Sequence, residues 1–386
     1  MKTTGLTKKR GSLITLGLAA SIFLAGANFG LAQSAQIGAR PLTPQEIHDL
    51  GLTNVYASGG LMTVGVGESV YLEAKVETGT VVNGVTWSIE SRPLAVPPSA
   101  AVLQDSPLPD DLPIYSPGDR YVLDLAGRKL FVPDVPGQFL IQAVVTTNSG
   151  SLVLQSKVTS AMYTGAGNIA NANPVYPQCA LCHQGNAIGW LETGHASFFE
   201  EAIDGIKSSH YGEDCTHCHV LGGHNPEAQN NNFWNVAASL PEPWTFPDVL
   251  QPGNWDAMPS ALKAKASIQC EHCHGAGSEH HGDKTAISVS FNAGDCGQCH
   301  DEAPYHNKNR EWLNSTHARV TDYPTGEGRG SCIKCHTAMG FVGTLDGKTG
   351  ITTDYEAISC AACHDPHDAG NHGQLRTVAD VTLQNG

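Results

Sequence analysis

The residues best suited to carry chemistry are twelve cysteines arranged in six identical units. In each unit two residues separate the cysteines and a histidine follows the second cysteine directly, so no cysteine is left over. The six units are Cys179-Cys182-His183, Cys215-Cys218-His219, Cys270-Cys273-His274, Cys296-Cys299-His300, Cys332-Cys335-His336 and Cys360-Cys363-His364. A C-x-x-C-H unit is the attachment signal for haem c, because the thiols form thioethers with two vinyl groups on one porphyrin edge and the histidine then ligates the iron.

Two other uses of paired cysteines fit this pattern poorly. A structural zinc site combines two C-x-x-C units and needs no histidine after each second cysteine. A disulfide scaffold shows varied spacings, usually in a shorter chain. The sequence therefore predicts six covalently attached haem c groups, with His183, His219, His274, His300, His336 and His364 as the proximal iron ligands.

Each iron also needs a distal ligand, and histidines outside the motifs are in surplus. His217 and His272 lie inside motifs, where thioethers constrain the helical turn, so we expect them to contact solvent or a propionate. His367 follows a proximal histidine by three residues and must serve a neighbouring haem if it is a ligand. The candidate distal ligands are His195, His210, His280, His317, His367 and His372, with His224 and His306 as alternatives to the last.

Methionine ligation cannot be general, because only Met162, Met258 and Met339 lie near the motifs in sequence. Bis-histidine iron, which has a lower reduction potential than His/Met iron, is therefore expected. No catalytic residue is assigned. A reductase of an oxyanion needs an exchangeable iron site flanked by cationic groups, and the arginines of this region are scattered, at Arg310, Arg319, Arg329 and Arg376.

An internal duplication surrounds the motifs. Trp190, Leu191, His195 and Ala196 follow the first motif in the same register in which Trp312, Leu313, His317 and Ala318 follow the fourth. The region therefore divides into two trihaem repeats, at about 179–281 and 296–367, and the first contains an insertion at about 221–268. The insertion is rich in proline and tryptophan, and we expect its tryptophans to cover haem edges or, alternatively, to form a partner-docking surface.

This region resembles a group of multihaem cytochromes that includes the ammonia-oxidation tetrahaem cytochrome, hydroxylamine oxidoreductase and the pentahaem nitrite reductase. The two Trp-x-x-x-x-His-Ala units and residues 270–280 and 360–367 carry the resemblance, which spans most of 176–372. It implies that His195 and His317 each ligate a haem other than the preceding one, and that His280 and His367 play similar parts. The chain departs from the group in lacking the C-x-x-C-K motif of the catalytic haem, and it has too few motifs for the octahaem oxidoreductase.

The N-terminus predicts export. Four cationic side chains precede a mostly apolar run at about 13–32, and residues 30–32 offer a small-x-small cleavage site. We expect a signal peptide within residues 1–35, with an uncleaved membrane anchor as the alternative. Haem c is attached outside the cytoplasmic membrane, so the leader and the motifs agree on a periplasmic or cell-surface protein. Membrane contact is expected only if the leader is retained.

The remaining N-terminal sequence predicts a β-sandwich. Residues 36–58 read as a linker with a short helix that begins at a Thr43 capping box; His48 on that helix is expected at the surface. Within residues 59–165, apolar and polar side chains alternate at 69–76, 85–89 and 138–145, and Gly/Pro turns separate these stretches. This pattern predicts the strands of an antiparallel β-sandwich. Residues 131–139 resemble bacterial immunoglobulin-like and PKD-like modules, which implies a binding or spacer role. Residues 165–174 read as the linker, and 166–386 as the hexahaem domain of short helices and coil.

Charge limits the partners. Loss of the leader would lower the formal charge from −15 to about −19, which argues against nucleic acid or anionic lipid and suits a redox partner with a basic docking face. Three functions fit the sequence: an electron carrier or conduit, which the surplus of histidines favours; a reductase of a nitrogen or sulfur oxyanion; and a self-associating, filament-forming surface cytochrome.

The complete use of cysteine in motifs generates the first prediction. Mass spectrometry of the mature protein should show six covalent haems and loss of the leader. A correctly matured sample with five or fewer haems would contradict the assignment.

Overall fold

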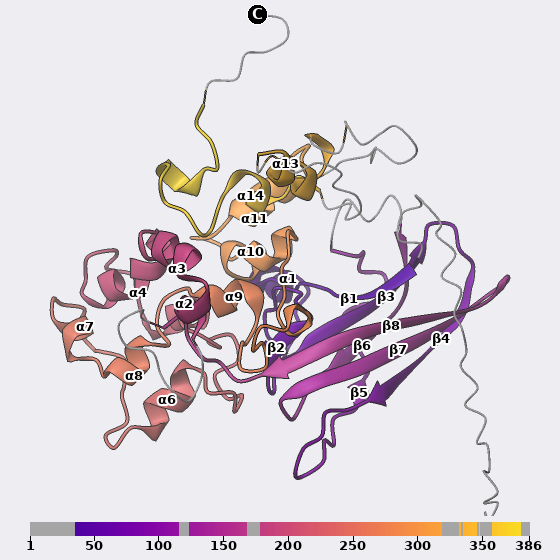
Figure 1. Cartoon of the computed structure of the whole chain (residues 1–386), viewed down its shortest axis with the longest axis horizontal. Helices are drawn as coiled ribbons and strands as arrows, with labels where there is room; N and C mark the ends of the chain where they lie inside the picture. The colour runs from indigo at the N-terminus through magenta and orange to yellow at the C-terminus, as the bar shows by residue number, and fades with distance from the viewer. Residues whose placement is uncertain are drawn as a thin grey trace, which may run out of the picture.

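The computed structural model describes residues 35–115, 123–167, 178–318, 335–345 and 357–379, with Cys332 and Gly347 besides. The expected leader and most of the expected linker at 165–174 lie outside these residues. All the β-strands precede residue 162, and nearly all the described helices follow it (Figure 1). No helix among the described residues is long and apolar enough to cross a membrane.

The N-terminal region contains two four-stranded sheets, as the sequence predicts. The first sheet has the order β1 (Ala35–Ala39), β3 (Val70–Glu77), β6 (Leu123–Phe131) and β5 (Leu103–Gln104); the second has the order β2 (Thr63–Gly65), β8 (Gly150–Ala161), β7 (Gly137–Thr147) and β4 (Val82–Ser91). Every pairing is antiparallel except that of β2 with β8, which is parallel. The exception arises because β2 continues through a turn into β3 of the other sheet, so no hairpin joins it to β8. Strand β1 begins at the last residue of the expected leader and otherwise lies in the stretch expected to be a linker.

The two sheets bury one shared core. Alternate residues of β3 and β7 point into it, and the rings of Phe131 and Phe139 meet edge to face at 5.1 Å. Asp134 accepts hydrogen bonds from the Ser99 hydroxyl and the Ala100 amide, so the run at 131–139 anchors a neighbouring loop. Gly137, with φ +120°, lies where a Cβ atom would meet Pro93 at 2.4 Å.

The C-terminal region consists of short helices joined by coil, also as predicted. The helices are α1 (Pro44–Asp49), which belongs to the N-terminal segment, α2 (Cys179–Cys182), α3 (Gln184–Leu191), α4 (Gly194–Ile203), α5 (Thr216–His219), α6 (Phe233–Ser239), α7 (Asn254–Ala257), α8 (Ser260–Lys263), α9 (Cys270–His274), α10 (Ala293–His300), α11 (Lys308–Leu313), α13 (Ala338–Leu345) and α14 (Cys360–Cys363), with 3-10 turns η2 (Glu213–Cys215), η3 (Lys284–Ala286) and η4 (His372–Gln374). Helices α2, α9 and α14 each begin at the first cysteine of a motif. The spacing of three residues then puts both thiols on one helical face.

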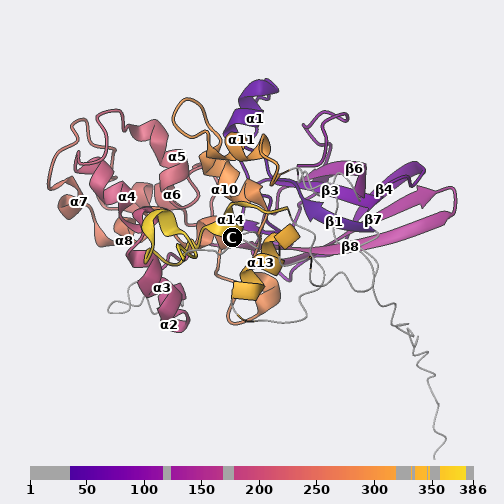
Figure 2. The ribbon, with the colours of Figure 1, turned by 90° about the horizontal axis from the view of Figure 1, so that it is seen from above.

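The helical region packs directly against one end of the sandwich, and α1 lies beside α10 and α11 (Figure 2). The Thr63 carbonyl of β2 lies 2.2 Å from where a Cβ atom of Gly275 would be, immediately after a motif histidine. On α1, the predicted capping box at Thr43 is present, and the buried Thr43 hydroxyl also donates to Asp301 Oδ2 at 2.8 Å. Asp49 at the end of α1 pairs with Arg310 at 2.7 Å. The sheets and the helices therefore share a close interface.

Thr43 provides a test of this interface. Replacing it with alanine removes both the helix cap and the hydrogen bond to Asp301, so T43A should lower the free energy of unfolding by about 1–3 kcal/mol. T43S retains the hydroxyl and should recover most of the loss, while the exposed Thr78→Ala serves as a control. Denaturant unfolding measures all three, and an unchanged T43A would show that the interface contributes little.

Candidate haem-binding sites

Imidazole rings on opposite sides of one iron have a characteristic spacing. An imidazole nitrogen binds a transition metal at about 2 Å, and the ring centroid lies about 1.1 Å behind that nitrogen, so the two centroids are about 6 Å apart. This spacing tests whether the histidines of this chain fit haem.

Three pairs of predicted ligands meet the spacing. The ring centroids lie 6.3 Å apart for His183 and His280, 6.2 Å for His195 and His300, and 5.9 Å for His274 and His367. Each pair joins a motif histidine to a histidine outside the motifs. His195 follows the first motif in sequence but faces the histidine of the fourth, and His367 follows the sixth motif but faces the histidine of the third.

At the second motif the ring that faces the motif histidine is that of His306, which the sequence left as an alternative to His372. His306 has its ring centroid 6.3 Å from that of His219, whereas His210 stacks on Tyr305 at 6.1 Å. His306 also lies 6.0 Å from His300, which is already paired with His195. His219 is therefore the motif histidine that His306 can serve.

The remaining predicted ligands are not brought together within the described residues. His317, His336, His364 and His372 show no ring contact with another histidine there. Much of 319–356 lies outside the described part of the chain, and that stretch joins the fourth motif to the sixth. Their roles as ligands stay predictions.

Backbone carbonyls orient several of these rings. Nδ1 of His274 lies 2.7 Å from the Ser288 carbonyl, Nδ1 of His364 lies 2.7 Å from the Gly373 carbonyl, and Nδ1 of His280 lies 2.9 Å from the Asp283 carbonyl. A ring that donates from Nδ1 is held in the tautomer whose Nε2 lone pair is free for a metal. These three imidazoles are therefore prepared for ligation through Nε2.

The two histidines inside motifs are arranged differently. His217 donates from Nδ1 to the Asp214 carbonyl and from Nε2 to Glu302 Oε2 at 2.9 Å. Burial opposes protonation of His217, but these hydrogen bonds raise its pKa to about 9. His272 accepts from the Gln269 amide at 3.0 Å and donates from Nε2 to the Val220 carbonyl at 3.1 Å. Both nitrogens of each ring are occupied, which leaves neither ring a free lone pair.

Burial favours the neutral form, which is the form that binds metal, in several of the paired imidazoles. It lowers the pKa of His219 to about 3 and that of His300 to about 4, and nearby imidazoles add to both shifts. Burial also lowers the pKa of His195. In addition, Nδ1 of His219 is buried without a hydrogen-bond partner.

Sulfur atoms of different motifs lie against one another. None of the twelve cysteines forms a disulfide, so all of them remain available for thioether bonds. Three pairs of cysteines from different motifs lie close enough for each thiol to shift the pKa of its partner: Cys179 with Cys270, Cys296 with Cys360, and Cys218 with Cys299. The pairs Cys179 with Cys270 and Cys296 with Cys360 are equivalent. In each repeat, the pair consists of the leading cysteine of the first motif and the leading cysteine of the third motif.

The two repeated tryptophans make equivalent contacts. The Trp190 indole donates to the Ile268 carbonyl at 2.9 Å, and the Trp312 indole donates to the Ile358 carbonyl at 2.8 Å. Both isoleucines lie two residues before the first cysteine of the third motif in their repeat. The repeated tryptophan thus ties each repeat's first motif segment to its third.

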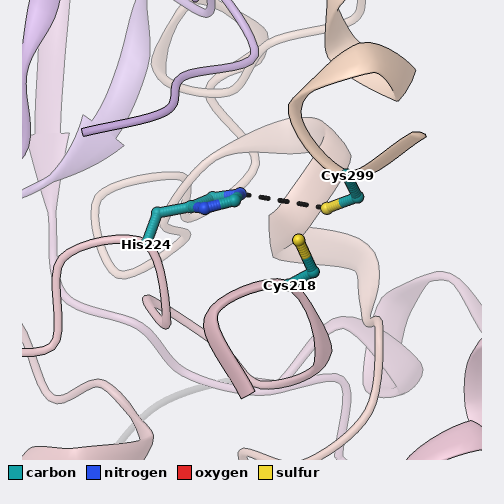
Figure 3. Close-up of side chains that lie close together, drawn as sticks. All are labelled: Cys218, His224 and Cys299. Carbon is teal, nitrogen blue, oxygen red and sulfur yellow. Dashed lines mark hydrogen bonds between the residues drawn. The ribbon is translucent and has the colours of Figure 1, made fainter. Parts of the chain in front are cut away.

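Cys218 and Cys299 approach each other beside His224 (Figure 3). His224 Nε2 lies 3.8 Å from Cys299 Sγ, and the three donor atoms lie within 4.8 Å of one another. Such a cluster could in principle hold a metal ion. It takes only one cysteine from each of two motifs, however, and leaves out Cys215 and Cys296, so it lacks the two complete C-x-x-C units of a structural zinc site.

The tryptophans of the insertion join a hydrophobic cluster beside the second motif. Trp234, Trp244 and Trp255 pack around the buried Phe199 and Phe233. The same cluster reaches the motif histidine, because the rings of Phe198 and Tyr211 lie 4.3 and 5.4 Å from that of His219. Phe198 and Tyr211, which precede the insertion, therefore form an apolar wall next to His219, and the tryptophans of the insertion belong to the cluster behind it.

Sequence comparison finds partial similarity to curated proteins. The chain is 30% identical over 131 residues to the C-type polyheme cytochrome OmcB from two strains of Geobacter sulfurreducens, PCA and DL-1/KN400. The alignment covers 29% of this chain but only 16% of that protein, so this chain spans a small part of the length of the curated relatives it matches. No protein-family model and no solved structure matches. The similarity is therefore distant and partial, and it lies with multihaem c-type cytochromes.

Proposed function

We propose that this chain is an exported hexahaem c-type cytochrome that transfers electrons through closely packed bis-histidine haems. The observation that carries the proposal is the set of four histidine pairs whose ring centroids lie 5.9–6.3 Å apart, each containing one motif histidine. The partial similarity to a polyheme cytochrome supports the same reading. Bound haem supplies an iron that gains and loses one electron, while the chain holds that iron between two imidazoles.

The proximity of these thiols supports a set of neighbouring positions for the proposed haems. The three pairs make neighbours of motifs one and three, two and four, and four and six. Cys273 of the third motif also lies near Cys299 of the fourth. An electron can then pass from motif one through three and four to six, with motif two as a branch. The fifth motif lies mostly outside the described residues.

Two described arginines of the helical region do not favour the alternative of an oxyanion reductase. Arg310 pairs with Asp49 at 2.7 Å, and Arg376 pairs with Asp365 at 2.8 Å and also donates to the Ala361 carbonyl. A guanidinium held in this way is not free to stabilise charge on a substrate. Arg319 and Arg329 lie outside the described residues. Electron transfer to a basic-faced partner is therefore the function we propose, with the sandwich as a support for the haem region.

Electron paramagnetic resonance of the oxidised protein tests this function. We expect every haem to be low-spin, because a motif histidine and a second histidine would hold each iron. A stoichiometric high-spin iron that binds nitrite, hydroxylamine or sulfite would contradict the proposal and favour the reductase.

Two adjacent histidines provide a matched pair of variants. His280→Ala removes the ring that faces His183, so one of the six haems should become high-spin. His281→Ala changes the next residue, which has no histidine ring opposite it, and should leave all haems low-spin. Electron paramagnetic resonance of the two variants at equal haem content measures the fraction of high-spin iron in each. Equal spectra for the two variants would show that His280 is not a ligand.

A further inference from the structure

A short loop connects two of the candidate sites. Residues 301–306 begin directly after His300 of the fourth motif and end at His306, which faces His219 of the second. The backbone closes this loop on itself, because the Glu302 amide donates to the His306 carbonyl at 2.6 Å and the His306 amide donates to the Glu302 carbonyl at 2.8 Å. The position of His306 therefore depends directly on that of Glu302.

The side chain of Glu302 reaches the helix that carries the facing histidine. Its Oε2 accepts from His217 Nε2 at 2.9 Å, and His217 lies in α5, two residues before His219. Glu302 thus holds the loop of His306 through its backbone and the helix of His219 through its carboxylate. The bond is charge-assisted and partly shielded from water, since about one third of each side chain is exposed.

The other side of the loop rests on α1. The Gln45 amide donates to the Asp301 carbonyl at 2.9 Å, and the Ala303 amide donates to Gln45 Oε1 at 2.9 Å. These two bonds fix the residues on either side of Glu302. The loop is therefore held between the N-terminal segment and the second motif.

We infer that Glu302 is a positioning residue that presents His306 as the distal ligand of the second motif's haem. The inference rests on the proposed function and extends it to a residue outside every motif. The other histidines near the second motif are directed elsewhere: His210 stacks on Tyr305, and His224 points to Cys299. Removing the carboxylate frees the loop from α5, so the bond from His306 to iron opens more often.

The ligand itself is tested first, by electron paramagnetic resonance of the fully loaded protein. His306→Ala should convert one haem from low-spin to high-spin, whereas His210→Ala should convert none. If His306→Ala stays entirely low-spin, or His210→Ala is the variant that converts, the inference is wrong. A normal haem count by mass spectrometry in the same samples leaves the proposed function standing in either case.

The positioning role is tested by carbon monoxide, which binds a reduced haem only when its distal ligand has dissociated. Glu302→Ala should increase the rate of carbon monoxide binding at one haem by about tenfold to a hundredfold, the usual effect of losing a residue that orients a metal ligand. Glu302→Gln keeps an oxygen acceptor for His217 and should remain within a few-fold of the unchanged protein. Glu311→Ala, which removes an exposed carboxylate paired only with Lys308, is the matched control.

The comparison between variants separates positioning from general instability. A structural effect alone would loosen several haems or lower the haem count, and Glu302→Gln would not rescue it. Carbon monoxide binding by Glu302→Ala at the rate of the Glu311→Ala control would overturn the positioning role.

Discussion

The spacing of two imidazoles across one iron is the constraint on which the rest of this structure depends. It requires two rings, often far apart in sequence, to face each other at about 6 Å. His195 and His300 are separated by more than a hundred residues, and His274 and His367 by more than ninety, yet both pairs meet this spacing. Short helices joined by coil can satisfy it because their own hydrophobic cores are small. Each such pair then serves as a cross-link between distant segments.

The sandwich is part of this scaffold. Strand β2 contacts the loop after His274. The segment that precedes β2 in sequence holds residues 301–306 through Thr43 and Gln45. The C-terminal region thus receives from the sheets the rigid support that its own helices, mostly one or two turns long, cannot provide. This arrangement gives the sandwich a role in supporting the helical region, in addition to any binding function that it has.

Local patterns predicted much of the fold, and non-local ones did not. The sequence predicted three features that depend on neighbouring residues. They are the cysteines three residues apart on a helix, the capping box at Thr43 and the alternation along β7. Strand β1 was not predicted, because its five residues include Gly38 and do not clearly alternate between apolar and polar side chains. The approach of His306 to His219 was not predicted for another reason: it depends on how residues 301–306 fold against α1 and α5, and no spacing from a motif encodes that fold.

An iron-edge anomalous diffraction map from crystals of the haem-loaded protein tests the central claim most directly. The account predicts one iron midway between the rings of each of four pairs: His183 with His280, His195 with His300, His219 with His306, and His274 with His367. Each iron should lie about 2 Å from one nitrogen of either ring. An iron bound by the motif histidine alone, with its partner ring turned away, would contradict the account.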